Sequence, residues 1–146
     1  MRKNEIDMNS EYWRHIEGFP SYYEASNYGR VRVLTHSSKD GRTIKKHILS
    51  QHTTSDGYLA VNHLVNGITG GVHNLVARAF LTIPNNIENY EVNHIDEDKH
   101  NNRVDNLEWC TRKYNVNYGD RTRHQLETMV SNGSINRKYL NGFFYY

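Results

Sequence analysis

The residues best suited to chemistry lie in one polar stretch, VNHIDEDKHNNRVDNLEW, at positions 92–109. Its first histidine, His94, stands between an asparagine and an isoleucine, and acidic residues and further asparagines follow. An imidazole with an ordinary pKa of about 6.5 is largely neutral at physiological pH and can accept a proton from water. Asparagine and aspartate side chains bond to nearby backbone groups and can order a polar loop. The stretch therefore pairs a candidate general base with a loop that its own side chains can hold.

The segments on either side of this loop are predicted to form a small ββα unit. Apolar and polar residues alternate at 107–111, which predicts a short strand with one face packed inward. A strand is predicted before the loop, at 91–95, and a helix after it, at about 111–118. This order of elements would place the loop at the tip of a two-stranded hairpin.

Apolar residues recur at helical spacing before this unit, at Val72, Leu75, Val76, Ala79 and Phe80. They predict a short amphipathic helix that ends before Pro84. Further upstream, turn signals and alternating residues predict strands at 30–34, about 45–50 and 58–65, with a hairpin loop around Asp40-Gly41. A last helix is predicted at about 121–130.

These elements together predict an α+β protein. It would consist of a small β-rich unit at 1–66, the ββα unit and its preceding helix at 67–120, and a helical tail at 121–146. A chain of 146 residues has room for one domain or two very small ones.

Charge is distributed unevenly along the chain, although the net charge is only +2. Basic residues dominate 30–46 and return at 112–123, whereas acidic residues dominate 88–108. This order of basic and acidic segments is expected for a surface that binds phosphates around a cation site. It is also expected for ordinary solvent-exposed faces. The net charge alone is too small to indicate nucleic acid.

Several classes of protein are excluded by composition. Cys110 is the only cysteine, which excludes a disulfide framework and a cysteine-rich zinc cluster. The N-terminus has no apolar signal core, and no stretch is long and apolar enough to span a membrane. We therefore expect an intracellular protein with no membrane partner.

The motifs of the chain resemble the HNH endonucleases of phage and intron-encoded type. The resemblance is carried by Asn93-His94-Ile95-Asp96, Asn101-Asn102, Asn106-Leu107-Glu108-Trp109, Thr111 and Asn115. Upstream, VHNLVA at 72–77 and Ala79-Phe80 resemble the helix that precedes the metal finger in that family. The short motif often found before such nucleases is matched by Trp13, Ile16, Gly18, Tyr23, Ser26-Asn27 and Gly29-Arg30-Val31-Arg32. The similarity covers about residues 11–118 and places the protein in the host cytoplasm if a phage encodes it.

The resemblance implies a metal-dependent DNA endonuclease with a ββα-metal finger. His94 matches the general base that activates water, and Asn106 matches the asparagine that ties the loop together and holds this base. Asn93 and Asn115 match the ligands of a single Mg²⁺, or Mn²⁺ as a substitute. Asn93 stands where the family often has an aspartate, so the phosphate would supply much of the negative charge at the metal.

Double-stranded DNA is the expected partner. The candidate phosphate contacts are Arg30, Arg32, Lys45 and Lys46 on the predicted hairpin, with Arg112 and Lys113 at the start of the helix that carries Asn115. Each of them could equally be a solvated surface residue. A single finger acts on one strand, so nicking is the expected product, and the oligomeric state, monomer or dimer, is left open.

Other assignments stay open at the level of sequence. Asp96 and Asp98 are interpreted as loop structure rather than ligands, and His73 as a structural histidine rather than a second base. His100 is left unassigned. The alternative function is a catalytically inactive DNA-binding module derived from such a nuclease. A nuclease that acts on RNA is a third possibility.

Overall fold

The computed structural model describes residues 6–62, 64 and 70–112. The predicted helices at 111–118 and 121–130 therefore lie almost wholly outside the described residues, as do Lys113 and Asn115. In the described part of the chain, no helix has both the length and the apolar character needed to cross a membrane.

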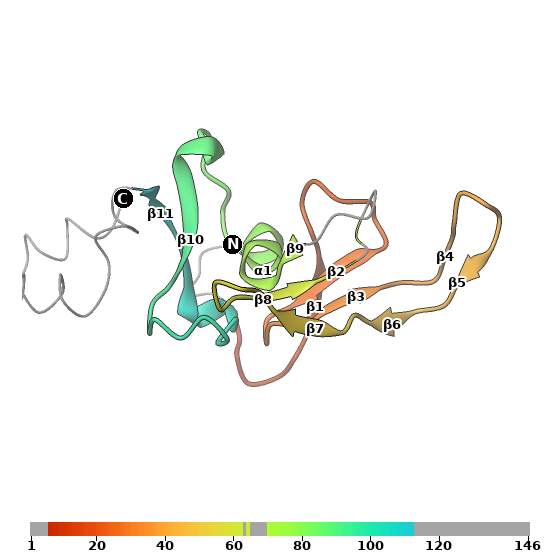
Figure 1. The fold of residues 1–146 in the computed structure, drawn as a ribbon, viewed down its shortest axis with the longest axis horizontal. Helices are drawn as coiled ribbons and strands as arrows, with labels where there is room; N and C mark the ends of the chain where they lie inside the picture. Colours follow the sequence, from red (N-terminus) through yellow and green to blue (C-terminus); the bar gives the residue numbers. More distant parts are fainter. Residues whose placement is uncertain (1–5, 63, 65–69, 113–146) are drawn as a thin grey trace, which may run out of the picture.

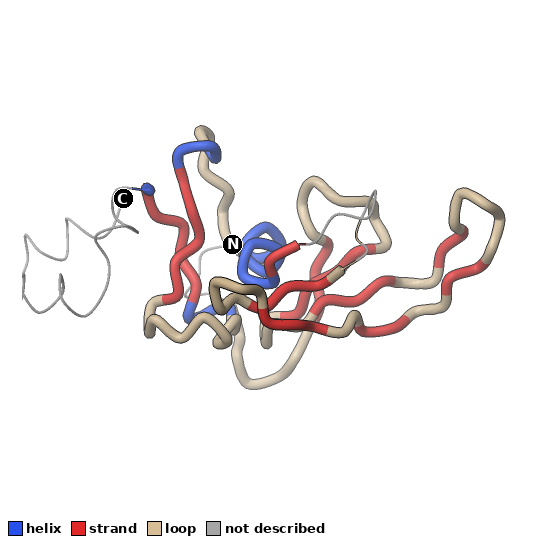
Figure 2. The backbone as a smooth tube through the Cα atoms, in the orientation of Figure 1, coloured by secondary structure: helices blue, strands red, loops and turns tan. Residues whose placement is uncertain are grey.

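Short antiparallel strands are the commonest regular elements of the described chain (Figure 1, Figure 2). One sheet has the order β1 (Trp13–His15), β2 (Tyr23–Ser26), β3 (Val31–Val33) and β6 (His47–Ile48). A second has the order β7 (Gln51–Thr53), β8 (Leu59–Val61) and β9 (Gly70–Gly71). Two hairpins pair β4 (His36–Ser37) with β5 (Thr43–Ile44), and β10 (Tyr90–His94) with β11 (Leu107–Thr111).

The helix α1 (Val72–Phe80) has the bounds that its apolar spacing predicts. Its buried residues are Val72, Leu75, Val76, Ala77 and Phe80, which form one face. The N–H of Leu81 closes the last turn on the carbonyl of Ala77, and Pro84 follows soon after. With two short 3₁₀ turns, η3 (Ile87–Asn89) and η4 (Val104–Asn106), these elements confirm the α+β prediction.

The helix α1 lies between the N-terminal strands and the β10–β11 hairpin (Figure 1). It contacts β1, β2, β3, β8 and β9 as well as β10, β11 and η4. One apolar cluster includes Ile16 and Val31 from the first side, Val76 from the helix, and Leu107 from the hairpin, all of them fully buried. The predicted units at 1–66 and 67–120 thus share this core where the structure describes them.

Beyond this core, β3 and β6 continue into a long β arm, residues 34–46, which carries β4 and β5 (Figure 1, Figure 2). Its tip turns at Gly41, whose φ of 87° is readily available only to glycine, and Ser38 N donates to the Arg42 carbonyl at 2.8 Å. The hairpin loop predicted around Asp40-Gly41 is therefore confirmed. The strand predicted at 45–50 is shorter than expected, because the chain passes from β6 to a different sheet at β7.

Candidate active site

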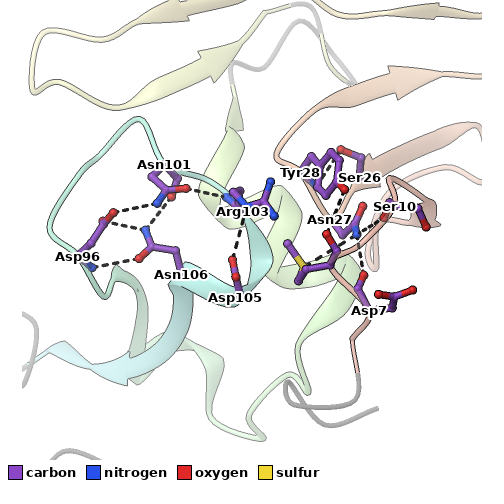
Figure 3. Close-up of polar contacts among 11 residues, drawn as sticks. Asp7, Ser10, Ser26, Asn27, Tyr28, Asp96, Asn101, Arg103, Asp105 and Asn106 are labelled. Carbon is purple, nitrogen blue, oxygen red and sulfur yellow. Dashed lines mark hydrogen bonds and ion pairs between the residues drawn. The ribbon is translucent and has the colours of Figure 1, made fainter.

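The loop that joins β10 to β11 is fastened by the Asn106 side chain (Figure 3). Its Oδ1 accepts from the Asp96 N–H at 3.0 Å, and its Nδ2 donates to Asp96 Oδ1 and to the Asn101 carbonyl, both at 2.9 Å. The Asn106 carbonyl also accepts from the Ile95 N–H at 2.8 Å. Hydrogen bonds from Asn101, from the loop backbone and from Asn106 outweigh desolvation and lower the pKa of the Asp96 carboxyl. Asn106 therefore closes the loop beside the residue that follows His94.

The imidazole of His94 is held by Asn102. His94 ends β10 and is 4% exposed, and its Nε2 lies 2.7 Å from Asn102 Oδ1. With Asn102 Oδ1 facing the ring, Nε2 is the donor of this hydrogen bond, and a neutral imidazole then has its lone pair on Nδ1. Burial lowers the pKa of His94, and the bond to Asn102 offsets part of this effect. The ring is therefore neutral at pH 7 and has the tautomer that a base acting through Nδ1 requires.

Two aromatic rings back the His94 imidazole. The His73 ring lies 5.2 Å from that of His94, and the Tyr58 ring stacks on His73 at 4.7 Å, measured between centroids. Burial is the main cause that lowers the pKa of His73 to about 4, with repulsion from a protonated His94 second, so His73 is neutral as well. A Cβ on Gly71 would come within 2.9 Å of the His73 ring, which explains a glycine there. His73, predicted as structural, thus belongs to the surroundings of the candidate base.

Beside these rings the surface is hollowed. A cleft of about 450 Å³ is lined by Asp56, Tyr58, His73, Asn74, Tyr90, Glu91 and Val92. Lys99 borders it, donating from Nζ to the Asp56 carbonyl at 2.7 Å and lying 4.7 Å above the Tyr58 ring. The cleft brings solvent close to the ring stack.

Asn93 has its amide nitrogen engaged by a neighbouring carboxylate. It is 6% exposed and pairs across the hairpin with Glu108, whose Oε1 accepts from Asn93 Nδ2 at 3.1 Å. The amide oxygen of Asn93 is consequently the atom that can ligate a cation. Glu108, which belongs to the sequence motif but was assigned no role from it, adds a negative charge beside it. These oxygen donors suit Mg²⁺ or Mn²⁺.

A zinc-type centre finds no support in this part of the chain. Among residues 6–62, 64 and 70–112, no group of three or more histidine, cysteine, aspartate or glutamate side chains is placed to hold a metal. Asn115, the second predicted ligand, lies outside the described residues.

Two of the predicted DNA contacts, Arg30 and Arg32, form ion pairs beside the N-terminal sheet. Arg32 donates through Nε and Nη2 to Glu24 Oε1 at 2.8 and 2.6 Å, and its guanidinium lies 4.2 Å from the Trp13 ring centroid. Arg30 pairs with Glu11, Nε to Oε2 at 2.9 Å, and lowers the pKa of that carboxyl. Both arginines therefore brace the β1–β2–β3 sheet.

The remaining predicted contacts are more accessible. Lys45 and Lys46 are exposed on the β arm. Arg112, with a side chain 70% exposed, pairs with Glu91 at 3.0 Å, and Lys113 lies outside the described residues.

The fold and the site define a class: a β-hairpin whose loop holds a buried histidine next to oxygen donors is the framework of a nuclease. The family models agree, since residues 11–62 match the NUMOD4 motif and residues 71–117 match the HNH endonuclease domain. The chain belongs to the HNH endonucleases, with a NUMOD4 motif preceding the nuclease domain.

Curated relatives come from viruses. The chain is 34% identical over 134 residues to the DNA endonuclease I-HmuI of Bacillus phage SP01, covering 85% of this chain and 60% of that protein. It is 39% identical over 97 residues to an uncharacterized HNH endonuclease of Acanthamoeba polyphaga mimivirus, covering 63% of this chain and 29% of the relative. The chain therefore spans less than two thirds of the length of either relative.

A solved structure of the HNH homing endonuclease I-HmuI, which concerns DNA binding and cleavage, has a similar fold. The TM-score is 0.54 at 30% identity, and the match covers 90% of this chain and 65% of that one.

Proposed function

We propose that this chain hydrolyses phosphodiester bonds of double-stranded DNA with the help of one divalent cation, Mg²⁺ or Mn²⁺. The observation that carries the proposal is the His94–Asn102 pair, in which Asn102 Oδ1 lies 2.7 Å from Nε2 of a buried imidazole. Membership of the HNH endonucleases and the likeness to I-HmuI support DNA as the substrate.

The side chains of the finger divide the work in this proposal. His94 accepts a proton at Nδ1 from the attacking water, and Asn106 keeps the loop closed around it. Asn93 and Asn115 hold the cation, with the Glu108 carboxylate supplying negative charge nearby. The cation, when bound, would neutralise charge on the scissile phosphate and the leaving oxygen. One such site cuts one strand, so we infer that the product is a nick.

The phosphates of the duplex are held by basic side chains in this proposal. Lys45 and Lys46 on the β arm are the principal contacts, and Arg112 and Lys113 act beside the finger. Arg30 and Arg32 would reach phosphates only by exchanging their partners, Glu11 and Glu24, for DNA.

A supercoiled-plasmid assay tests this function. The wild-type protein with Mg²⁺ or Mn²⁺ should convert supercoiled DNA to the nicked circle, and EDTA should stop it. His94→Ala should nick roughly 10²–10⁴-fold more slowly, the range that one general base contributes, while binding DNA equally in a mobility-shift assay. His100→Ala, which removes an exposed histidine of the same loop, is the matched control and should keep wild-type activity.

One feature favours the second candidate, a DNA-binding module without cleavage: Asn93 presents a neutral amide where a metal site would gain from a carboxylate. If wild type and His94→Ala bind plasmid equally and neither nicks it, this second function is correct. RNA of the same sequence, incubated in parallel, separates a DNA nuclease from an RNA nuclease.

A further inference from the structure

The turn at residues 26–30 of the NUMOD4 segment, hereafter the brace turn, is tightly closed by its own hydrogen bonds. Ser26 Oγ accepts from the N–H groups of Tyr28 and Arg30 at 3.2 and 3.0 Å. The Gly29 N–H donates to the Ser26 carbonyl at 3.1 Å, and Gly29 has a φ of 93°. Because glycine adopts this φ without strain, the turn has one well-defined shape.

Asn27 fixes the brace turn to the chain that precedes β1 (Figure 3). Its side chain is fully buried. The Oδ1 accepts from the Tyr12 N–H at 2.9 Å, and Nδ2 donates to the carbonyls of Asp7 and Ser10 at 3.0 and 2.9 Å. From β7, Gln51 Nε2 donates to the Gly29 carbonyl at 3.0 Å. The turn is therefore held by two segments that are far apart in sequence.

Three consecutive residues of the brace turn contact three consecutive residues of the loop between β10 and β11, hereafter the finger loop, in reverse order. A Cβ on Gly29 would lie 3.0 Å from the Cβ, carbonyl carbon and carbonyl oxygen of Asn102, so the two residues are in direct contact. The Arg103 guanidinium lies 4.5 Å from the Tyr28 ring centroid. The Val104 N–H donates to the Asn27 carbonyl at 3.0 Å. Residues 27–29 thus line residues 102–104, although the two segments are far apart in sequence.

We propose that the brace turn positions the candidate base. Its contact with Asn102 fixes the position of Asn102 Oδ1, and this oxygen in turn fixes the His94 ring through Nε2. The NUMOD4 segment is then part of the catalytic framework, in addition to any contact that it makes with DNA. Gly29, Tyr28 and Asn27 act as positioning residues, and Gly29 does so by having no side chain. This inference deepens the proposed nuclease function and rests on it for the role of His94.

Gly29→Ala and Gly18→Ala form a matched pair for the test. Gly18 has nearly the same φ, 89°, but a Cβ there would meet only Arg78 Nη1, at an ordinary 3.5 Å. Both variants carry similar backbone strain, and only Gly29→Ala forces Asn102 to move. The first readout is the ¹H–¹⁵N spectrum of the His94 ring in protein free of DNA and metal, where a single Nε2–H tautomer is expected for the wild type.

We expect Gly29→Ala to shift or mix the His94 ring signals, and Gly18→Ala to leave them as in the wild type. In plasmid nicking, Gly29→Ala should lower kcat with little change in KM for DNA, and by less than the roughly 10²-fold that a misplacement of about 1 Å costs, because Asn102 has to move by only a few tenths of an ångström. A raised KM with an unchanged kcat would mean that the brace turn acts only in DNA binding, and this would contradict the inference.

Unchanged His94 signals in a folded Gly29→Ala protein would overturn the inference even if the wild type nicks DNA. Conversely, a wild type that does not nick, with His94 signals that still respond to Gly29→Ala, would refute the nuclease function and leave the positioning role standing. Should Gly29→Ala not fold, Tyr28→Ala removes the ring from Arg103 without backbone strain. It should shift the same signals, and their constancy would equally refute the proposal.

Discussion

At the scale of single residues, His73 makes stability depend on pH. Its pKa of about 4 in the folded chain lies below the ordinary value near 6.5, so between these values only the unfolded chain binds the proton. Stability is therefore fully present above about pH 6.5 and falls as pH drops towards 4, with a total loss of roughly 2–3 kcal/mol. His94, whose pKa is also lowered, adds to the loss in the same direction.

Urea unfolding at pH 7.5 and pH 5 measures this dependence. His73→Phe should unfold with a much smaller difference between the two pH values than the wild type. His52→Gln, which removes an exposed histidine on β7, should keep the wild-type difference. An equal difference in wild type and His73→Phe would show that the ring stack is not the origin of the effect.

A second prediction at this scale concerns Asn93 and Glu108. Asn93→Asp would bring two carboxylates together where an amide now donates to Glu108, so the metal-free protein should lose about 1 kcal/mol, or roughly 2–4 °C in Tm. A divalent cation relieves this repulsion, so Mg²⁺ should raise the Tm of Asn93→Asp more than that of the wild type. Adding Glu108→Gln should remove the extra metal response. Equal Mg²⁺ responses in all three proteins would argue against a cation at this position.

The sequence identifies some of these residues and conceals others. His94 is visible because its type and its surrounding motif are informative. Asn101, Asn102 and Asn106 are alike in type and lie within six positions, and only the folded loop shows that Asn102 reaches the imidazole while Asn106 closes the loop. Glu108 would have been found by pairing the strands, since the hairpin register sets it opposite Asn93.

At the scale of elements, the finger loop depends on one buried amide. Asn106→Ala removes two donated hydrogen bonds and one accepted bond and leaves the Asp96 N–H without its partner, so we expect a loss of roughly 2–4 kcal/mol of unfolding free energy. Asn101→Ala is the control: it removes an exposed bond to Asp96 Oδ2 and a long one, 3.5 Å, accepted from the Arg103 N–H, and should cost less than about 1 kcal/mol. Chemical denaturation measures both, and equal losses would show that the loop is not closed by Asn106.

Element prediction succeeded where local signals were long or sharp. Five apolar residues at helical spacing defined α1, and Asp40-Gly41 defined the turn of the β arm. The division of the strands among sheets could not be predicted, because strands of two to five residues carry too little periodicity to specify partners. The ion pair of Arg32 with Glu24 could not be predicted for the same reason. It depends on the register of β2 and β3, which places these two residues opposite each other.

At the scale of the whole molecule, the β arm and the finger lie apart, with α1 and the core between them (Figure 1). Under the proposed function, the basic charge of Lys45 and Lys46 on the arm would hold a duplex without touching the base or the cation. Binding and cleavage should then respond to different substitutions, since substitutions on the arm change affinity and substitutions in the finger change turnover.

The last prediction uses this separation. Lys45→Gln with Lys46→Gln should weaken DNA binding uniformly across sequences, and the slope of log K against log salt should fall in magnitude by about 2, close to one for each phosphate that is no longer neutralised. Nicking should show a raised KM and an unchanged kcat at saturating DNA. Arg32→Gln should leave the slope unchanged, because Glu24 already neutralises that guanidinium. If Arg32→Gln lowers the slope by about 1 and the double lysine variant does not, the duplex lies on the β1–β2–β3 sheet rather than along the arm.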